Sequence, residues 1–322
     1  MSNWRTRLAA ISCLLLVEIG GTSLLGQPAS APKPPMFAFP THVAATPDGH
    51  IYVTDSLRNR VHWLRDTDLD LAGGWGYAGS ADGQFNRPMG IAVDGNGSVF
   101  VADTSNARIQ KFDVAGSVFK AKWDGLGSGA GPLRRPVAVA VEGNVLQGNV
   151  YVLDVETFIV HKLRNDLGGY LGSLGGVRGT GDGEFSSIGG DLAGLAVNPA
   201  GNLYISDPGN HRIQKWTISS DPTGNIISAT FSGWLGACTG GANCDTASQR
   251  SRGFSCTAAT CTVTASRSGT LPGQFTSPAG LALDTGGYLF VADYGNTRIQ
   301  TFDSSGNPSN AWGSRGSGPD QF

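Results

Sequence analysis

The chain has 322 residues, 48 of them glycine, and a formal net charge of −2. Glycine at roughly twice its average usage of about 7% argues against a helical protein and indicates many tight turns, while 40% apolar residues exclude a disordered chain. Because the balance of charge is slightly acidic, it offers no basic surface for phosphate groups, and we expect no nucleic-acid partner.

The first 31 residues have the pattern of a secretory signal peptide. Two arginines precede an apolar run over 8–17, and small residues follow up to the Ala-Ser-Ala of 29–31. Glu18 ends the apolar run well short of the roughly 18 residues that a membrane span needs, although an uncleaved anchor is the alternative. We therefore expect cleavage after Ala31, a Pro-rich linker over 32–38, a mature chain without a membrane span, and export to the periplasm or the extracellular space.

From residue 39 to the end, one pattern of about 45 residues recurs five times. Each unit opens with an apolar stretch such as 88–94, passes through a Gly/Asn/Asp-rich turn such as 94–97, and adds a second apolar stretch that ends in Asp. A third stretch starts five residues after that Asp, as at 108–112, and a fourth ends in Trp or Leu beside Gly. Short apolar stretches joined by tight turns predict β-hairpins. The units open at Pro40, Pro88, Pro136, Leu192 and Pro278.

Four short strands in each unit are typical of a β-propeller blade. A four-stranded sheet with two apolar faces cannot bury both faces alone, so the units must pack against one another around an axis. The predicted fold class is therefore all-β, a β-propeller of four-stranded blades over 39–322 with five units visible.

The start of the third stretch carries a family resemblance. The run Asn210-His211-Arg212-Ile213-Gln214-Lys215, together with the runs at 106–109 and 296–299, resembles NHL repeats, which are named for an Asn-His-Leu signature. The third unit departs from the pattern, and the first places Asn59 one residue late. The resemblance implies six blades. Residues 318–322 also match the connectors at 83–85 and 273–275 that lead into a new unit, so truncation at the C-terminus and a true five-bladed ring both remain open.

Four cysteines fall in an insert over 237–268, within the fourth unit. In an exported protein such a cluster predicts two disulfides, whose pairing the sequence leaves open among three possibilities. The alternative is a four-cysteine zinc site, although the spacing lacks the paired C-x2-C motifs that such sites show. The cysteines are Cys238, Cys244, Cys256 and Cys261.

Charged residues recur at two positions of the units. An Asp ends each second stretch and an Arg starts most third stretches, so the simplest interpretation is structural: the Asp accepts N–H groups of a turn and pairs with the Arg. A ring of charges that binds an ion in the axial channel is the alternative. The residues are Asp55, Asp103, Asp154, Asp207 and Asp293, with Arg60, Arg108, Arg212 and Arg298.

Two classes of related propeller enzyme provide the rival hypothesis. Peptide-amidating lyases hold zinc through histidines of several blades, and gluconolactonase-like propellers hold calcium or zinc through Glu, Asn and Asp. Here only His42 lies beside a unit opening, and His62 and His161 are placed one residue apart in register on the third stretch. Three Glu residues, 142, 156 and 184, gather in the third unit and indicate a distinctive surface. We predict no catalytic residues and no cofactor, with Ca or Zn reserved for a metal-dependent lyase or lactone hydrolase.

The predicted function is that of a non-catalytic binding scaffold for a protein or glycan ligand. Loops on a rigid scaffold carry recognition, and the stapled insert is the most individual loop of the chain. Its basic and aromatic side chains could bind an acidic or glycan surface, and deletion of 238–261 is expected to leave the fold intact. The residues are Arg250, Arg252, Phe254 and Arg267.

Overall fold

The computed structural model defines most of the repeat region. The signal-peptide pattern and residues 32–36 lie outside the described residues, which are 37–46, 49–65, 69, 71–113, 118–126, 129, 131–142, 148–186, 192–238, 244–245, 250–251, 253–257, 259–261, 268–316 and 321–322. Within this part, no helix has the length and apolar character needed to cross a membrane.

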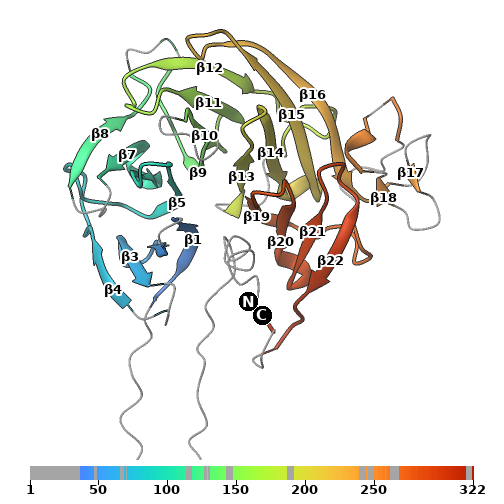
Figure 1. The fold of residues 1–322 in the computed structure, drawn as a ribbon, viewed down its shortest axis with the longest axis horizontal. Coiled ribbons are helices and arrows are strands. Elements are labelled where there is room, and N and C mark those ends of the chain that lie inside the picture. Colours follow the sequence, from blue (N-terminus) through green and yellow to red (C-terminus); the bar gives the residue numbers. More distant parts are fainter. Residues whose placement is uncertain are drawn as a thin grey trace, which may run out of the picture.

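Five four-stranded antiparallel sheets follow one another around a ring (Figure 1), each with its strands in chain order from the axis to the rim. This confirms the all-β propeller. The blades are β1 (Pro40–Ala45), β2 (His50–Asp55), β3 (Arg60–Arg65) and β4 (Leu71–Trp75); β5 (Pro88–Val93), β6 (Val99–Asp103), β7 (Arg108–Phe112) and β8 (Phe119–Trp123); β9 (Pro136–Val141), β10 (Val150–Asp154), β11 (Ile159–Leu163) and β12 (Tyr170–Gly175); β13 (Leu195–Val197), β14 (Asn202–Asp207), β15 (Arg212–Ser220) and β16 (Ile226–Gly236); and β19 (Pro278–Leu283), β20 (Leu289–Asp293), β21 (Arg298–Phe302) and β22 (Pro308–Trp312).

The expectation of six blades is wrong: the ring has five. Each of the five sheets contains one second strand that ends in Asp, and the sequence has five such strands. The 3-10 turns η2 (Thr104–Asn106), η4 (Pro208–Asn210) and η6 (Tyr294–Asn296) link the second and third strands of the second, fourth and fifth blades.

One residue before each third strand has a left-handed backbone conformation. Its φ lies between 49° and 60° at Asn59, Ala107, Phe158, His211 and Thr297. Asn tolerates this conformation better than most residues. The one-residue displacement of Asn59 in the first unit therefore places an Asn where the backbone favours it.

Neighbouring blades share apolar clusters, and these clusters form the core. Tyr52 and Ile91 belong to the cluster between blades one and two, whereas Ile205 and Leu153 belong to that between three and four. Inner strands approach so closely that a Cβ on Gly90 would lie 2.7 Å from Cα of Ala138. Among the described residues, blades one and five share no apolar cluster. Each has a separate cluster, around Ile51 in the first blade and around Phe290 in the fifth.

The fourth blade differs from the others at the rim. Its strands β15 and β16 have 9 and 11 residues, so their hairpin extends toward the outer strand of the third blade (Figure 1). The insert follows β16 and contains the short pair β17 (Cys244–Asp245) and β18 (Arg250–Ser251) and the turn η5 (Gly253–Ser255). The hairpin therefore lies toward the third blade and the insert toward the fifth.

Candidate functional site

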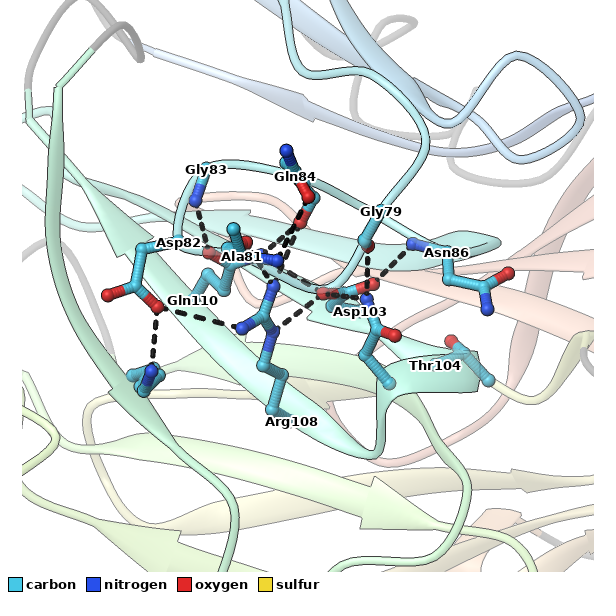
Figure 2. A network of polar contacts seen from close by, with 12 residues as sticks. Gly79, Ala81, Asp82, Gly83, Gln84, Asn86, Asp103, Thr104, Arg108 and Gln110 are labelled. Carbon is cyan, nitrogen blue, oxygen red and sulfur yellow. Dashed lines mark hydrogen bonds and ion pairs between the residues drawn. The ribbon is translucent and has the colours of Figure 1, made fainter.

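The recurring Asp and Arg side chains tie each blade to the connector that precedes it. In the second blade (Figure 2), Oδ2 of Asp103 accepts hydrogen bonds from Asn106 at 2.9 Å, Arg108 at 2.7 Å and Gln110 at 3.0 Å. Arg108 and Gln110 also donate to the main-chain carbonyl of Gln84 in the connector, at 3.0 and 2.7 Å. We call this set of four side chains on the blade the Asp–Arg network.

The fourth and fifth blades repeat the Asp–Arg network. The Nε–Oδ2 distance is 2.9 Å for Arg212 and Asp207 and 2.8 Å for Arg298 and Asp293. In both blades the Arg also donates to connector carbonyls, and the blade's Asn and Gln donate to the same Asp oxygen. These charges are therefore paired within the fold.

The first and third blades keep the Asp without an Arg from the start of the third strand, and in the first blade Arg58 of the preceding turn lies 3.7 Å from Asp55 instead. Asp55 accepts the main-chain N–H groups of Ala38 and Phe39 at 2.8 and 3.0 Å, and Asp154 accepts that of Arg134 at 2.7 Å. Arg60 instead donates to the carbonyl of Gly74 on the surface. Of the four arginines grouped by sequence, the structure thus brings three onto their Asp and leaves Arg60 apart.

Burial and hydrogen bonding act in opposite directions on these carboxyl groups. Burial dominates at Asp103 and Asp293 and raises the pKa of both, although hydrogen bonds from the preceding connector and from the Asn and Arg side chains oppose the shift. At Asp55, burial is outweighed by the nearby His62 and by main-chain N–H donors, so the pKa falls to about 2. The networks position carboxylates without exposing them to a ligand.

His42 lies on β1, the inner strand of the first blade. Its neighbours in register on the other inner strands are small: Gly90, Ala138, Gly194 and Gly280. The imidazole is buried, and within the described part of the chain neither ring nitrogen makes a hydrogen bond of normal geometry. Burial lowers the pKa of His42 to about 4, and the main-chain carbonyl of Ala193, from the fourth blade, opposes only part of that shift.

The other histidines do not join His42. His62 and His161 occupy the same position of their strands, opposite Val53 and Val152, and not positions one residue apart as the sequence had indicated. Gln110, Gln214 and Gln300 take this position in the other blades. Nδ1 of His211 accepts the N–H of Ser277 at 2.9 Å, so this imidazole joins the fourth blade to the connector before the fifth.

The insert contains the one group of three or more potential metal ligands among the described residues. Sγ atoms of Cys238, Cys256 and Cys261 all lie within 4.8 Å of one another. Cys256 is disulfide-bonded to Cys261, which confirms a disulfide, and Cys238 is in a disulfide as well. Because a zinc site requires free thiolates, these three cysteines do not form one in this state.

Phe254 lies in the core and not on the surface of the insert. Its side chain is 9% exposed, packs 5.2 Å from the ring of Tyr204, and belongs to the cluster between blades four and five. Its N–H donates to the carbonyl of Ser305 in the fifth blade, at 3.2 Å. The binding role expected for Phe254 therefore has to be withdrawn, and the expectation that 238–261 can be deleted without effect on the fold disagrees with this packing. Of the three arginines, Arg250 lies in β18, and Arg252 and Arg267 lie outside the described residues.

A partly buried carboxylate, that of Glu142, distinguishes the third blade. Glu142 accepts hydrogen bonds from the hydroxyl of Tyr151 at 3.2 Å and from Asn149 at 2.8 Å, and its Oε1 lies 3.7 Å from Nζ of Lys162. Lys162 is 1% exposed and donates to Ser220 of the extended hairpin at 2.8 Å. Burial lowers the pKa of Lys162, and the Glu142 carboxylate opposes that shift. Glu142 is one of the three Glu residues that the sequence analysis noted in the third unit, and it contacts both Tyr151 and Lys162. The other two Glu residues do not share these contacts.

A model of the NHL repeat matches residues 37–64, 85–112, 191–216 and 275–302, which belong to blades one, two, four and five. The chain is an NHL-repeat β-propeller protein. The third blade, where the Asn and Arg of the signature are replaced, has no match to the repeat model. No curated protein matches the chain significantly.

Solved structures resemble this NHL-repeat propeller in fold alone. Virginiamycin B lyase from Staphylococcus aureus is 11% identical with a TM-score of 0.50, and the match covers 86% of this chain and 71% of the lyase. An auxiliary nutrient binding protein from Bacteroides thetaiotaomicron is 10% identical with a TM-score of 0.54, over 87% of this chain and 58% of that protein. U3-55K is 9% identical with a TM-score of 0.52, over 83% and 62%.

A groove between the third and fourth blades of the NHL-repeat propeller had no counterpart in the sequence predictions. It has a volume of about 400 Å³ and is lined by 172–175 of β12, by 226–229 of β16 and by Trp216. Ile227 on its wall is 67% exposed. The signal that could have located this groove is the unusual length of the stretch between Arg212 and the insert, which forms the extended hairpin.

The stability of the NHL-repeat propeller is expected to fall in acid because of His42. The unfolded chain titrates near the ordinary value of 6.5 and the folded chain at about 4, so the unfolded chain binds more protons between these values. The stabilisation is present above pH 6.5 and is lost as the pH falls to 4, by about 3 kcal/mol at about 1.4 kcal/mol per pKa unit. Urea unfolding at several pH values should show that His42→Leu removes this part of the pH dependence and that His50→Leu keeps it. Equal acid sensitivity of His42→Leu and the parent would contradict the assignment.

Proposed function

We propose that this NHL-repeat propeller is an exported, non-catalytic binding scaffold whose partner contacts the loop face and the disulfide-stapled insert. The observation that carries the proposal is the anchoring of the insert. Its η5 turn packs between blades four and five through Phe254, and Cys256–Cys261 closes the segment that follows. A loop held in this way loses little conformational entropy when it binds a partner.

The proposal of export rests on two independent features. The signal-peptide pattern of 1–31 directs a chain out of the cytoplasm, and disulfides persist mainly in oxidising compartments. Cys256–Cys261 is such a bond. Both features support the same destination, outside the cytoplasm.

The insert's charge indicates the kind of partner. Arg250, Arg252 and Arg267 give it a local positive charge in a chain whose net charge is −2. Opposite charge steers association and restricts the choice of partner. We therefore propose a protein or glycan that presents acidic groups.

The test uses the mature chain, 32–322, immobilised and exposed to exported proteins and surface glycans of its own host. Arg→Gln at 250, 252 and 267 together should reduce the retained partner at least about tenfold, because the steering charges are gone while the disulfides and Phe254 remain. The control variant removes the same charge from three exposed arginines of the third blade, Arg134, Arg164 and Arg178, and should retain the partner. Equal retention by the insert variant, or no retention by the parent, would overturn the proposal.

A further inference from the structure

Two blades carry the same Tyr–Lys pair. Tyr151 lies directly opposite Lys162 on β10 and β11, and Tyr204 lies directly opposite Lys215 on β14 and β15. In both pairs the ammonium group lies over the aromatic ring, 5.4 Å from its centroid for Lys162 and 5.8 Å for Lys215. Because the two blades are repeats, each pair offers the same two donors, a hydroxyl and an ammonium, to its surroundings.

The third blade shows what this pair holds. The carboxylate of Glu142, the residue after β9, accepts from Tyr151 at 3.2 Å and neutralises Lys162 at 3.7 Å. A Tyr hydroxyl and a Lys ammonium together thus form a two-point site for one carboxylate.

In the fourth blade the internal carboxylate is missing. The equivalent of Glu142 is Asn198, since Glu142 and Asn198 each donate their N–H across the first turn of the blade, to Asn149 and Asn202. Oδ1 of Asn198 is occupied by the N–H groups of Ala200 and Asn202, at 3.1 and 2.9 Å. Across the described part of the chain, neither the Tyr204 hydroxyl nor Nζ of Lys215 has a hydrogen-bond or ion-pair partner.

The insert completes the surroundings of this unfilled pair. The ring of Phe254 lies 5.5 Å from Nζ of Lys215, so two aromatic rings flank the cation. Lys215 remains partly exposed, whereas its counterpart Lys162 is buried. Burial lowers the pKa of Lys215 with no opposing charge, which is the environment of a desolvated cation without its counter-ion.

The second blade provides a comparison. There Lys111 lies over the ring of Phe100 and reaches an oxygen of the next blade, the carbonyl of Asn165 at 3.0 Å. Lys162 likewise reaches Ser220 of the next blade. Lys215 is the member of this series for which the next blade provides no such oxygen among the described residues, because Phe254 packs there instead.

We propose that Tyr204 and Lys215 bind a carboxylate group of an external ligand, in the way that Tyr151 and Lys162 bind Glu142. The inference deepens the proposed binding function, on which it rests, by naming the chemical group that the partner presents beside the insert. The carboxylate accepts the hydroxyl proton of Tyr204 in a hydrogen bond and pairs with the ammonium of Lys215. No bond is made or broken.

The test measures binding of two carboxylate probes by calorimetry, acetylated hexaglutamate for peptides and trigalacturonate for glycans, with sulfate as a control anion. Lys215→Met should weaken the carboxylate probe that binds by about tenfold or more, and Tyr204→Phe should weaken it severalfold, because charge-assisted hydrogen bonds are lost. Lys122→Met removes the same charge from the exposed Lys122 and should leave affinity unchanged. The probe that binds identifies the source as peptide or glycan.

A third variant supplies the missing carboxylate from within. Asn198→Asp keeps the turn, as Asp94 does in the second blade by accepting the N–H groups of Asn96 and Ser98 at 2.9 and 2.8 Å. It places a negative charge beside Lys215, as Asp94 does beside Lys111, and should weaken probe binding about as much as Lys215→Met. Thermal unfolding confirms that each variant is folded.

The outcomes separate this inference from the scaffold proposal. Failure of both probes to bind the parent, or equal binding by Lys215→Met and the parent, overturns the carboxylate site. If host partners are still retained through the insert arginines in that case, the scaffold proposal stands. Loss of probe binding in Lys215→Met without any host partner retained supports the carboxylate site and overturns the scaffold proposal.

Discussion

Replacing Phe254 with alanine is expected to lower the free energy of unfolding by about 4 kcal/mol, the usual cost of removing a buried Phe ring. The ring fills space between Tyr204 of the fourth blade and Leu235 of β16 in the cluster shared with the fifth blade. It also approaches Gly306, where an added Cβ would lie 2.8 Å from a ring carbon. The neighbouring blades are rigid sheets that cannot collapse into the space, so the cavity persists. Urea unfolding of the oxidised protein measures the loss.

Two further variants test whether the insert is part of the core. Leu126→Ala removes a residue that is 69% exposed and should change the stability by less than about 0.5 kcal/mol. Cys256→Ser with Cys261→Ser opens a loop of sequence separation 5 and should cost about 2 kcal/mol in the chain-entropy account. A loss of less than 1 kcal/mol for Phe254→Ala would show that the insert is only decoration on the blade.

Sequence reasoning misplaced Phe254 for a physical reason. Strand residues reveal burial through alternation, but Phe254 stands in a short 3-10 turn without any periodicity. Its contacts, at Tyr204 and at the turn around Ser305, lie far away in sequence and become neighbours only when blades four and five pack. The cysteines around Phe254 favoured the prediction of an exposed loop, although Phe254 packs in the core between blades four and five.

The blades themselves could be predicted because their chemistry is local. The Gly/Asn/Asp turns, the Asp at the end of each second strand and the strand alternation all act over a few residues and repeat in each unit. The register between neighbouring strands could not be predicted from the sequence. The shared position of His62 and His161 opposite Val53 and Val152, and the equivalence of Glu142 and Asn198, depend on which residues face each other across strands.

The carboxylate site was beyond sequence reasoning for the same cause. Tyr204 and Lys215 are 11 positions apart and neither belongs to a recognised motif. Only the pairing of β14 with β15 places them side by side, and only the comparison with Tyr151 and Lys162 shows which partner is missing. Internal repeats thus provide a reference for comparing equivalent positions within one chain.

Breaking the Asp–Arg network of the second blade should cost about 4 kcal/mol, as removal of one partner from a buried ion pair does. Asp103 is fully buried, and its Oδ2 lies 2.7 Å from Nε of Arg108. Arg108→Ala leaves that carboxylate without its cation and removes the Arg108 hydrogen bonds to the connector carbonyls of Ala81 and Gln84, of which the Gln84 carbonyl keeps a second donor, Gln110. Guanidinium chloride unfolding of the mature chain measures the change, with a melting temperature as a second readout.

Arg60→Ala is the matched control, because Arg60 starts the same strand of the first blade. Its guanidinium donates to the carbonyl of Gly74 at the surface and not to Asp55, so the change should stay within about 0.5 kcal/mol. A difference of more than 2 kcal/mol between the two variants would show that the network carries stability. Similar losses of stability in the two variants would mean that the repeated Arg does not stabilise the blade. The alternative from the sequence, a ring of charges that binds an ion in the axial channel, would then be favoured.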